Sequence, residues 1–210
     1  MEFNMITDLV VKVSLTGAGS AVMWFLVLLS IISLTVVIER WVFFVKNSGA
    51  ADLLAQQIGG KLAAGETEEA KKILKEETGF AAKVVSAALE VSPKGKEAMS
   101  EMAQSTAKVE KLRFEKGLAF LGTLGNNAPF IGLFGTVLEI IAALSEMGTN
   151  SAGQVGANAV MSTLSAALAA TAVGLLVALP AVAFYNYFAR RLKSLNTGAE
   201  ALLHVVFANR

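Results

Sequence analysis

Between residues 117 and 189 the chain carries only two charged side chains, both glutamates. A helix needs about 20 apolar residues to cross the roughly 30 Å hydrocarbon core of a bilayer, and two segments of this stretch, 118–144 and 160–187, are that long. A third apolar segment, 21–44, lies earlier in the chain. Because a helix satisfies its own backbone polar groups in lipid, the sequence predicts an all-α membrane protein with three transmembrane helices.

The composition narrows the class further. The chain is 54% hydrophobic and 17% charged, whereas about a quarter of the residues in soluble domains are charged. A nucleic-acid-binding surface needs a concentrated basic face, and the net charge of +1 gives no support to one, so we expect no nucleic-acid partner. There is no cysteine, which excludes disulfides and thiolate metal sites. The single histidine, His204, has no second histidine with which to share a metal, so we expect a solvated or tail-packing side chain, no metal site and no cofactor.

The first apolar segment has an alternative interpretation as a cleaved signal peptide. Three features oppose it: the preceding residues carry one lysine, Lys12, against Glu2 and Asp8; the apolar run is longer than that of a signal peptide; and no small-residue cleavage site follows. Charged and aromatic side chains at 39–41 suit the edge of a bilayer. We therefore expect 21–44 to be retained as the first transmembrane helix.

Orientation follows from the basic residues in the connecting segments. Segment 45–117 carries twelve Lys and Arg, and the tail 188–210 carries four. The loop 145–159 carries none, and segment 1–20 has Lys12 alone. Basic residues accumulate on the cytoplasmic side of a membrane, so the N-terminus is predicted outside and the C-terminus in the cytoplasm.

Outside the spans the pattern is also helical. Segment 1–20 resembles a short amphipathic helix at the outer surface. The cytoplasmic segment 45–117 carries mixed, interspersed charges, as on solvated helix faces. We expect several short helices in it and extensions of the second and third spans into the cytoplasm. From about Lys94 onward, past Gly95, no helix-breaking residue appears before Gly117, which predicts one unbroken rod into the second span. The expected breaks before Lys94 are at Gly59-Gly60, Gly65, Gly79 and Ser92-Pro93.

The second and third spans contain residues that suit helix contacts or a wet cavity. Pro129 frees a backbone carbonyl that lipid cannot satisfy, and Gly132 and Gly135 permit close backbone approach. The third span is rich in Ala, Gly, Ser and Thr and contains Pro180. Helix packing without any transport explains these features as well as an ion path does.

Glu139 lies inside the second span, three residues after Thr136. A lone carboxylate at membrane depth costs several kcal/mol when it is ionised and unpaired, so such residues are rare and usually functional. The alternative is a side chain that reaches the outer surface and binds nothing. These two interpretations of Glu139 stay open at this point.

Two motifs carry a family resemblance. Ala-Pro-Phe-Ile-Gly-Leu-Phe-Gly-Thr-Val at 128–137 and Ala-Thr-Ala-Val-Gly-Leu-Leu-Val-Ala-Leu-Pro-Ala-Val at 170–182, followed by Tyr185-Asn186, resemble the MotA/TolQ/ExbB family of proton-channel motor subunits. The ExbB/TolQ branch fits better than MotA, which has four spans. The resemblance implies a non-enzymatic stator or channel subunit in the bacterial inner membrane. Such a subunit converts proton motive force into work at the cell envelope, in outer-membrane import, envelope maintenance or gliding.

The resemblance also implies partners and a site. Such proteins form homo-pentamers whose second and third helices line a lumen. In that lumen lie single-span ExbD/TolR-like partners, each with an intramembrane Asp. The family's lumen threonines correspond to Thr136 and Thr171. An ion path through Glu139, Thr136 and Thr171 is therefore expected, with Pro129, Gly132, Gly135 and Pro180 in helix packing or kinks.

The chain departs from the family pattern at positions 166 and 139. ExbB and TolQ carry a Glu five residues before the third-helix Thr, where this chain has Ala166, and their second helix usually has Gly at the position of Glu139. At 1.5 Å rise per residue, Glu139 lies about 4.5 Å outward from Thr136, and Ala166 about 7.5 Å outward from Thr171. We therefore hypothesise that Glu139 replaces the missing carboxylate in the path of a proton or a sodium ion.

Two other functions remain as alternatives. The absence of the family Glu fits a structural membrane scaffold that conducts no ions itself. A secondary transporter fits less well, because three spans are too few for internal repeats around a midplane site.

Overall fold

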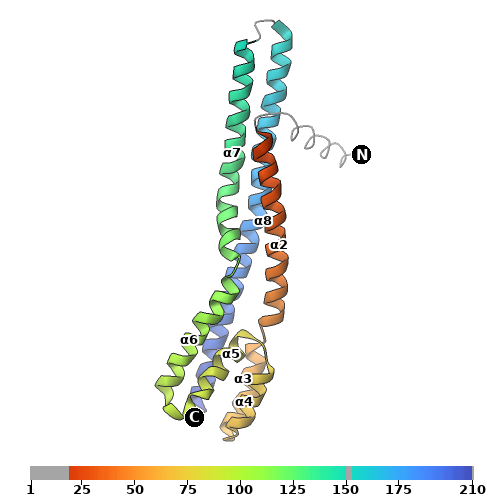
Figure 1. Cartoon of the computed structure of the whole chain (residues 1–210). Helices are drawn as coiled ribbons and strands as arrows, with labels where there is room; N and C mark the ends of the chain where they lie inside the picture. Colours follow the sequence, from red (N-terminus) through yellow and green to blue (C-terminus); the bar gives the residue numbers. More distant parts are fainter. Residues whose placement is uncertain (1–18, 150–152, 210) are drawn as a thin grey trace, which may run out of the picture. The chain divides into compact units, whose positions relative to one another are not determined.

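The computed structural model describes residues 19–149 and 153–209, with the backbone alone for 146–149, 153–160, 162 and 166. Every regular element in these ranges is helical, as the sequence predicts (Figure 1). Three candidate membrane spans lie at Ser20–Ala63, Leu118–Ser145 and Thr163–Ala208. The predicted outer-surface helix 1–20 lies outside the described residues, except for its last two positions. In chain order the elements are α2 (Ser20–Asn47), α3 (Ala51–Ala63), α4 (Thr67–Glu76), α5 (Phe80–Glu90), the 3₁₀ turn η1 (Ser92–Lys94), α6 (Lys96–Glu115), α7 (Leu118–Thr149) and α8 (Gly153–Ala208).

The chain divides into two compact units. We call the described residues of Met1–Val36 and Ala119–Tyr185 the span unit, and those of Val37–Leu118 and Asn186–Arg210 the charged unit. The boundaries fall within α2, within α8 and at the junction of α6 and α7.

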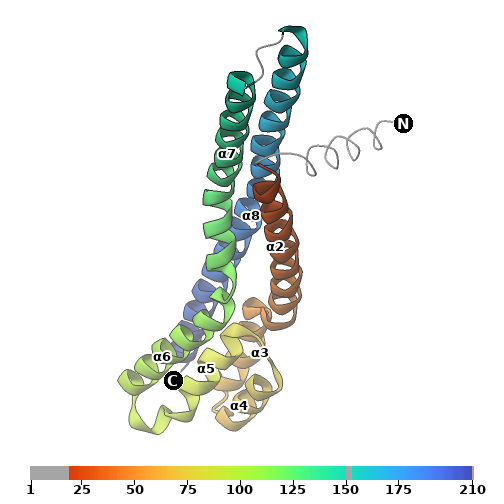
Figure 2. The same cartoon turned by 45° about the horizontal axis from the view of Figure 1, so that its top comes forward.

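The span unit is built from the first part of α2 with most of α7 and α8, which lie side by side in Figures 1 and 2. Its core combines two leucines with small side chains, which lets the helices approach closely as in other membrane helix pairs. Leu26 of α2 is fully buried there. The buried cluster comprises Leu26, Leu124, Ala128, Val177, Ala178 and Ala181.

The charged unit has an aromatic core around Phe114 of α6, which is fully buried. Its ring centroid lies 4.9 Å from that of Phe43, 4.9 Å from that of Phe44 and 5.6 Å from that of Phe80, all in edge-to-face arrangements. Edge-to-face pairs are favoured by the ring quadrupoles. This cluster therefore joins the last turns of α2 to α5 and α6.

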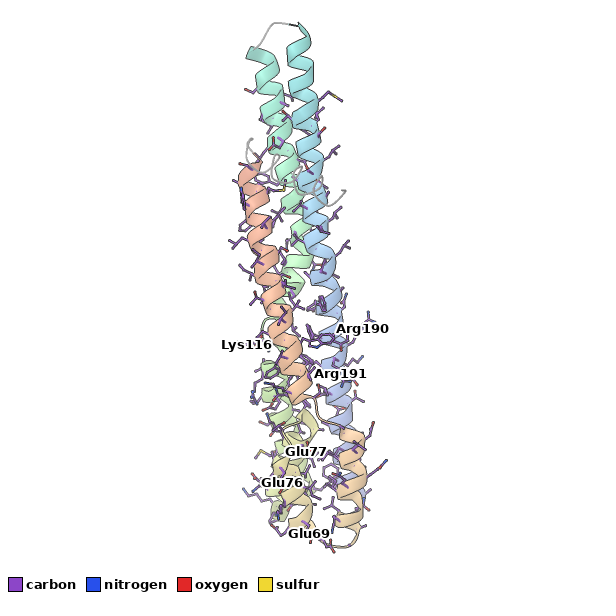
Figure 3. All side chains as sticks on the ribbon, turned by 90° about the vertical axis from the view of Figure 1, so that its right-hand side faces the viewer. Glu69, Glu76, Glu77, Lys116, Arg190 and Arg191 are labelled. Atoms are coloured by element: carbon purple, nitrogen blue, oxygen red, sulfur yellow. The ribbon has the colours of Figure 1, made fainter. Side chains whose placement is uncertain are left out.

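Charged side chains cover the surface of the same unit, as predicted for solvated helix faces. The six that Figure 3 labels are all exposed and come from α4, the residue after it, the α6–α7 junction and α8. A hydrogen bond from Lys61 lowers the pKa of the Glu69 carboxyl. Such exposed pairs contribute little to stability, because water and salt screen them.

Two expected helix boundaries differ from the structure. A break at Gly59-Gly60 was expected, but α3 continues through these glycines. Each glycine destabilises a helix by about 1 kcal/mol relative to alanine. The burial of Leu54, Ile58 and Leu62 on one face of α3 outweighs this cost. The predicted breaks at Gly65, Gly79 and Ser92-Pro93 do coincide with helix boundaries.

The predicted unbroken rod into the second span is wrong. α6 ends at Glu115 and α7 begins at Leu118. Between them Gly117 has φ +78°, a left-handed conformation that ends a helix. Arg40 Nη1 donates to the Arg113 carbonyl at 3.0 Å, which satisfies an acceptor in the last turn of α6.

The second and third spans extend beyond their expected ends. α7 continues to Thr149 and α8 begins at Gly153, so helical residues occupy most of the predicted loop 145–159. At its other end α8 continues to Ala208, in line with the expected extension of the third span.

Replacing Phe114 with Ala should destabilise the charged unit strongly, because it removes a fully buried ring that contacts three others. Losses of about 3–5 kcal/mol are typical of such changes. Thermal unfolding of the detergent-solubilised protein, followed by circular dichroism, measures the effect. Leu112→Ala is the control, because Leu112 lies on the same helix and is 69% exposed. Equal melting temperatures for the two variants would contradict the aromatic core described here.

Candidate ion-path site

The structure brings the two predicted threonines together. Thr136 of α7 and Thr171 of α8 are half-buried, and their Oγ1 atoms lie 2.6 Å apart, a hydrogen bond in which either hydroxyl can donate. Thr136 Oγ1 also lies 3.2 Å from the Gly132 carbonyl oxygen and 3.1 Å from the Ala167 carbonyl oxygen. The pair therefore forms a small cluster of oxygens where α7 crosses α8.

Glycines make this close crossing possible. A Cβ added to Gly132 would lie 2.7 Å from the Ala170 carbonyl oxygen, and one added to Gly174 would lie 2.7 Å from the Ala128 carbonyl oxygen. Both contacts are with backbone, which cannot turn aside as a side chain can. The two helices therefore touch backbone to backbone one turn away from the threonine pair, as in other membrane helix pairs with small residues.

Gly135 lies where α7 meets both of its neighbours. A Cβ at this position would lie 3.1 Å from Val22 Cγ1 of α2 and 3.2 Å from Ala170 Cβ of α8. The two predicted kink positions are internal to their helices: Pro129 in α7 is half-buried and Pro180 in α8 is exposed. Both helices continue through their prolines.

The Glu139 side chain is buried within the folded chain, and only 4% of its surface is exposed. Its Oε1 accepts a hydrogen bond from the Gly19 backbone N–H at 2.7 Å. Gly19 directly precedes α2. Within the described residues no hydrogen bond joins Glu139 to Thr136 or Thr171, so the carboxylate and the threonine pair make separate contacts.

Sequence reasoning missed three participants in this site: Gly19, Gly174 and the Ala167 carbonyl. A carbonyl leaves no sequence signal. Gly174 lies within the motif at 170–182. That it faces Gly132 becomes visible only when the two helices are paired. Gly19 belongs to a Gly-Ala-Gly-Ser run before the first span, which marks a chain break but names no partner. The Ala166 side chain lies outside the described part of the structure.

Over the described ranges no three His, Asp or Glu side chains gather around a possible metal position. What the chain offers is an apolar three-helix unit with a hydroxyl pair where two helices cross. These features are those of a helical membrane protein whose spans pack closely.

Comparison with known proteins gives the family. The profile of the MotA/TolQ/ExbB proton channel family matches residues 67–201, more than half of the chain. The chain belongs to this family, whose members are transport proteins rather than enzymes.

Several curated relatives are named ExbB. Biopolymer transport protein ExbB of Neisseria gonorrhoeae is 46% identical over 92 residues, which are 44% of this chain and 41% of that protein. Putative biopolymer transport protein ExbB-like 2 of Helicobacter pylori strain 26695 is 41% identical over 96 residues, 46% of this chain and 63% of that protein. Each match therefore covers less than two thirds of the relative's own length.

Gly132→Ala should force α7 away from α8, because the new methyl group would meet the Ala170 carbonyl oxygen at 2.7 Å. Overpacking of this kind costs about 1–3 kcal/mol. The matched control is Gly122→Ala in the same helix, whose methyl group would lie 3.2 Å from the exposed Tyr185 ring, which can turn. Thermal unfolding in detergent compares them. A Gly132→Ala protein at least as stable as Gly122→Ala would contradict the backbone contact.

Proposed function

We propose that this chain is the channel and stator subunit of an ion-driven motor in the bacterial inner membrane. With an ExbD/TolR-like partner it converts proton motive force into mechanical work at the cell envelope. The observation that carries the proposal is the Thr136–Thr171 hydroxyl pair at a glycine-mediated crossing of two apolar helices. The family match and the relatives named as biopolymer transport proteins support it.

The chemistry of the pair suits ion transfer. Hydroxyl groups both donate and accept hydrogen bonds, so they can stabilise water or a passing ion beside an otherwise apolar wall. Thr136 Oγ1 has one proton and two carbonyl oxygens near it, so its hydroxyl can turn between acceptors without moving the helix. One charge that crosses 100 mV releases about 2.3 kcal/mol, enough to bias such a transfer.

The carboxylate that takes up and releases the proton belongs, in this proposal, to the partner. Its single span carries an intramembrane Asp, which would face the threonine pair from within a lumen formed by several copies of this chain, five in the proposed assembly. Large apolar side chains on α7, such as Phe130, Leu133 and Phe134, are more than half exposed in one copy and suit contacts with lipid or with further copies. A direct role for Glu139 in the path stays a prediction.

Valine in place of the threonines tests the proposal, because it keeps the side-chain shape and removes the hydroxyl. Thr136→Val with Thr171→Val should reduce ion uptake by vesicles containing the chain and its partner by about tenfold or more, as expected when the barrier to ion transfer rises by roughly 1.4 kcal/mol. The control is Thr35→Val in α2. Thr35 Oγ1 donates to its own helix carbonyl at Ile31, 2.9 Å away, and is exposed.

Normal uptake by the double variant would overturn the role of the hydroxyl pair. If the unaltered chain co-purifies with its partner yet conducts no ions, the protein is instead a scaffold of such a complex.

Topology is testable because the chain has no cysteine. The basic residues of 45–117 predict that this segment is cytoplasmic. A single cysteine at position 77, which is exposed, should react with a membrane-impermeant thiol reagent only after the inner membrane is opened. A cysteine at position 150, in the predicted periplasmic loop, should react in spheroplasts with an intact membrane. The reverse pattern would contradict the proposed orientation.

A further inference from the structure

The contact between Glu139 and Gly19 assigns a role to the carboxylate that differs from ion transfer. We infer that Glu139 is a positioning residue that fixes the start of the first membrane helix, α2, against α7. The contact lies wholly within the span unit and joins residues 120 positions apart in the chain.

The chemistry at the start of a helix explains why a carboxylate is favourable here. The first N–H groups of a helix have no acceptor within it, and the N-terminus carries a partial positive charge. The Gly19 carbonyl already accepts from Met23 N at 3.1 Å, so Gly19 is where the hydrogen bonding of α2 begins. Its own N–H donates to Glu139 Oε1 at 2.7 Å. Within a bilayer no water would replace that acceptor.

The absence of a side chain at Gly19 is required for this contact. A Cβ at this position would lie 2.5 Å from Glu139 Oε1 and 2.8 Å from Glu139 Cγ. These distances leave no room for any other residue while the carboxylate keeps its place. A side chain at position 19 would therefore displace the Glu139 carboxylate from this contact.

Over the described residues, the contact begins a continuous seam between α2 and α7. One turn further along α2, Val22 packs against Gly135, and Leu26 then enters the buried cluster with Leu124 and Ala128. Residues 19, 22 and 26 share one face of α2, as the spacing of three and four predicts. The Glu139 contact thus sets the register in which this face meets α7.

Thr136 lies on the same turn of α7 as Glu139. By holding α7 against α2, Glu139 would keep Thr136 in place beside Thr171, and this consequence for ion flow rests on the proposed function. The contact between the helices does not depend on it.

A cysteine pair tests the contact directly in a chain that has no other cysteine. A Cβ built on Gly135 lies 3.5 Å from Val22 Cβ, at the short end of the range of about 3.5–4.5 Å seen in disulfides. Val22→Cys with Gly135→Cys should therefore form a disulfide in membranes under mild oxidation. Its rate of formation, measured by gel shift after a timed quench, reports the register of α2 on α7.

Glu139→Gln keeps an oxygen at the position of Oε1, so the cross-linking rate should stay within about twofold of the unaltered protein. Glu139→Val removes the acceptor, and the rate should fall by about fivefold or more, since a buried N–H is left unpaired. The control is Ile141→Ala on the same helix, which is 58% exposed and should leave the rate unchanged. An unchanged rate in Glu139→Val, or an equal loss in Glu139→Gln, would overturn the inference.

A double-mutant cycle covers the case in which Glu139→Val fails to accumulate. Gly19→Ala alone should slow cross-linking, because its methyl group meets the carboxylate. In a Glu139→Ala background the same Gly19→Ala change should have little further effect, since the obstructing side chain is gone. Equal effects in both backgrounds would refute the pairing.

Ion uptake in the same variants separates this inference from the proposed function. Thr136→Val with Thr171→Val should reduce uptake by about tenfold or more and leave cross-linking intact. If Glu139→Gln also keeps uptake, the positioning role accounts for Glu139. If it keeps cross-linking and loses uptake, the carboxylate also serves the ion path.

Discussion

The backbone contact between α7 and α8 sets the distance between these helices, and the positions of the polar atoms in the span unit depend on that distance. Gly132 and Gly174 let the helices meet without intervening side chains, and only at that separation do the hydroxyls of Thr136 and Thr171 lie 2.6 Å apart. Lipid offers helices no hydrophobic reason to associate, so close van der Waals packing and hydrogen bonds across the interface must supply it. The same contact thus stabilises the unit and places its polar atoms.

Two of the buried ionisable side chains, Glu139 and Arg40, contact backbone groups at helix ends. Glu139 accepts from the N–H that precedes α2, and Arg40, which is 4% exposed, donates to a carbonyl in the last turn of α6. Each charge has the sign that suits the partial charge of the helix end it meets. The two contacts stand one in each unit, and both satisfy backbone groups that would otherwise be costly to bury.

The sequence predicted the fold well because the length of an apolar run is a physical requirement of a bilayer. It failed at Gly59-Gly60 and at Gly117, where helix propensity gives way to packing in one case and to a left-handed turn in the other. Thr136 and Thr171 were predicted as site residues from the family motifs. The hydrogen bond between them could not be predicted, because it depends on how closely α7 and α8 pack. The partner of Glu139 was out of reach, since a contact between positions 120 residues apart leaves no local pattern.

The Gly19–Glu139 contact has a consequence for related sequences. A relative with a small residue at the position of Glu139 would have no carboxylate to exclude a side chain at position 19. Where a carboxylate is present, glycine is favoured at position 19, because any Cβ would lie 2.5 Å from the oxygen unless the carboxylate gives up its place. The two positions should therefore co-vary among relatives: glutamate at the second should appear with glycine at the first, and the first should diversify when the second is small.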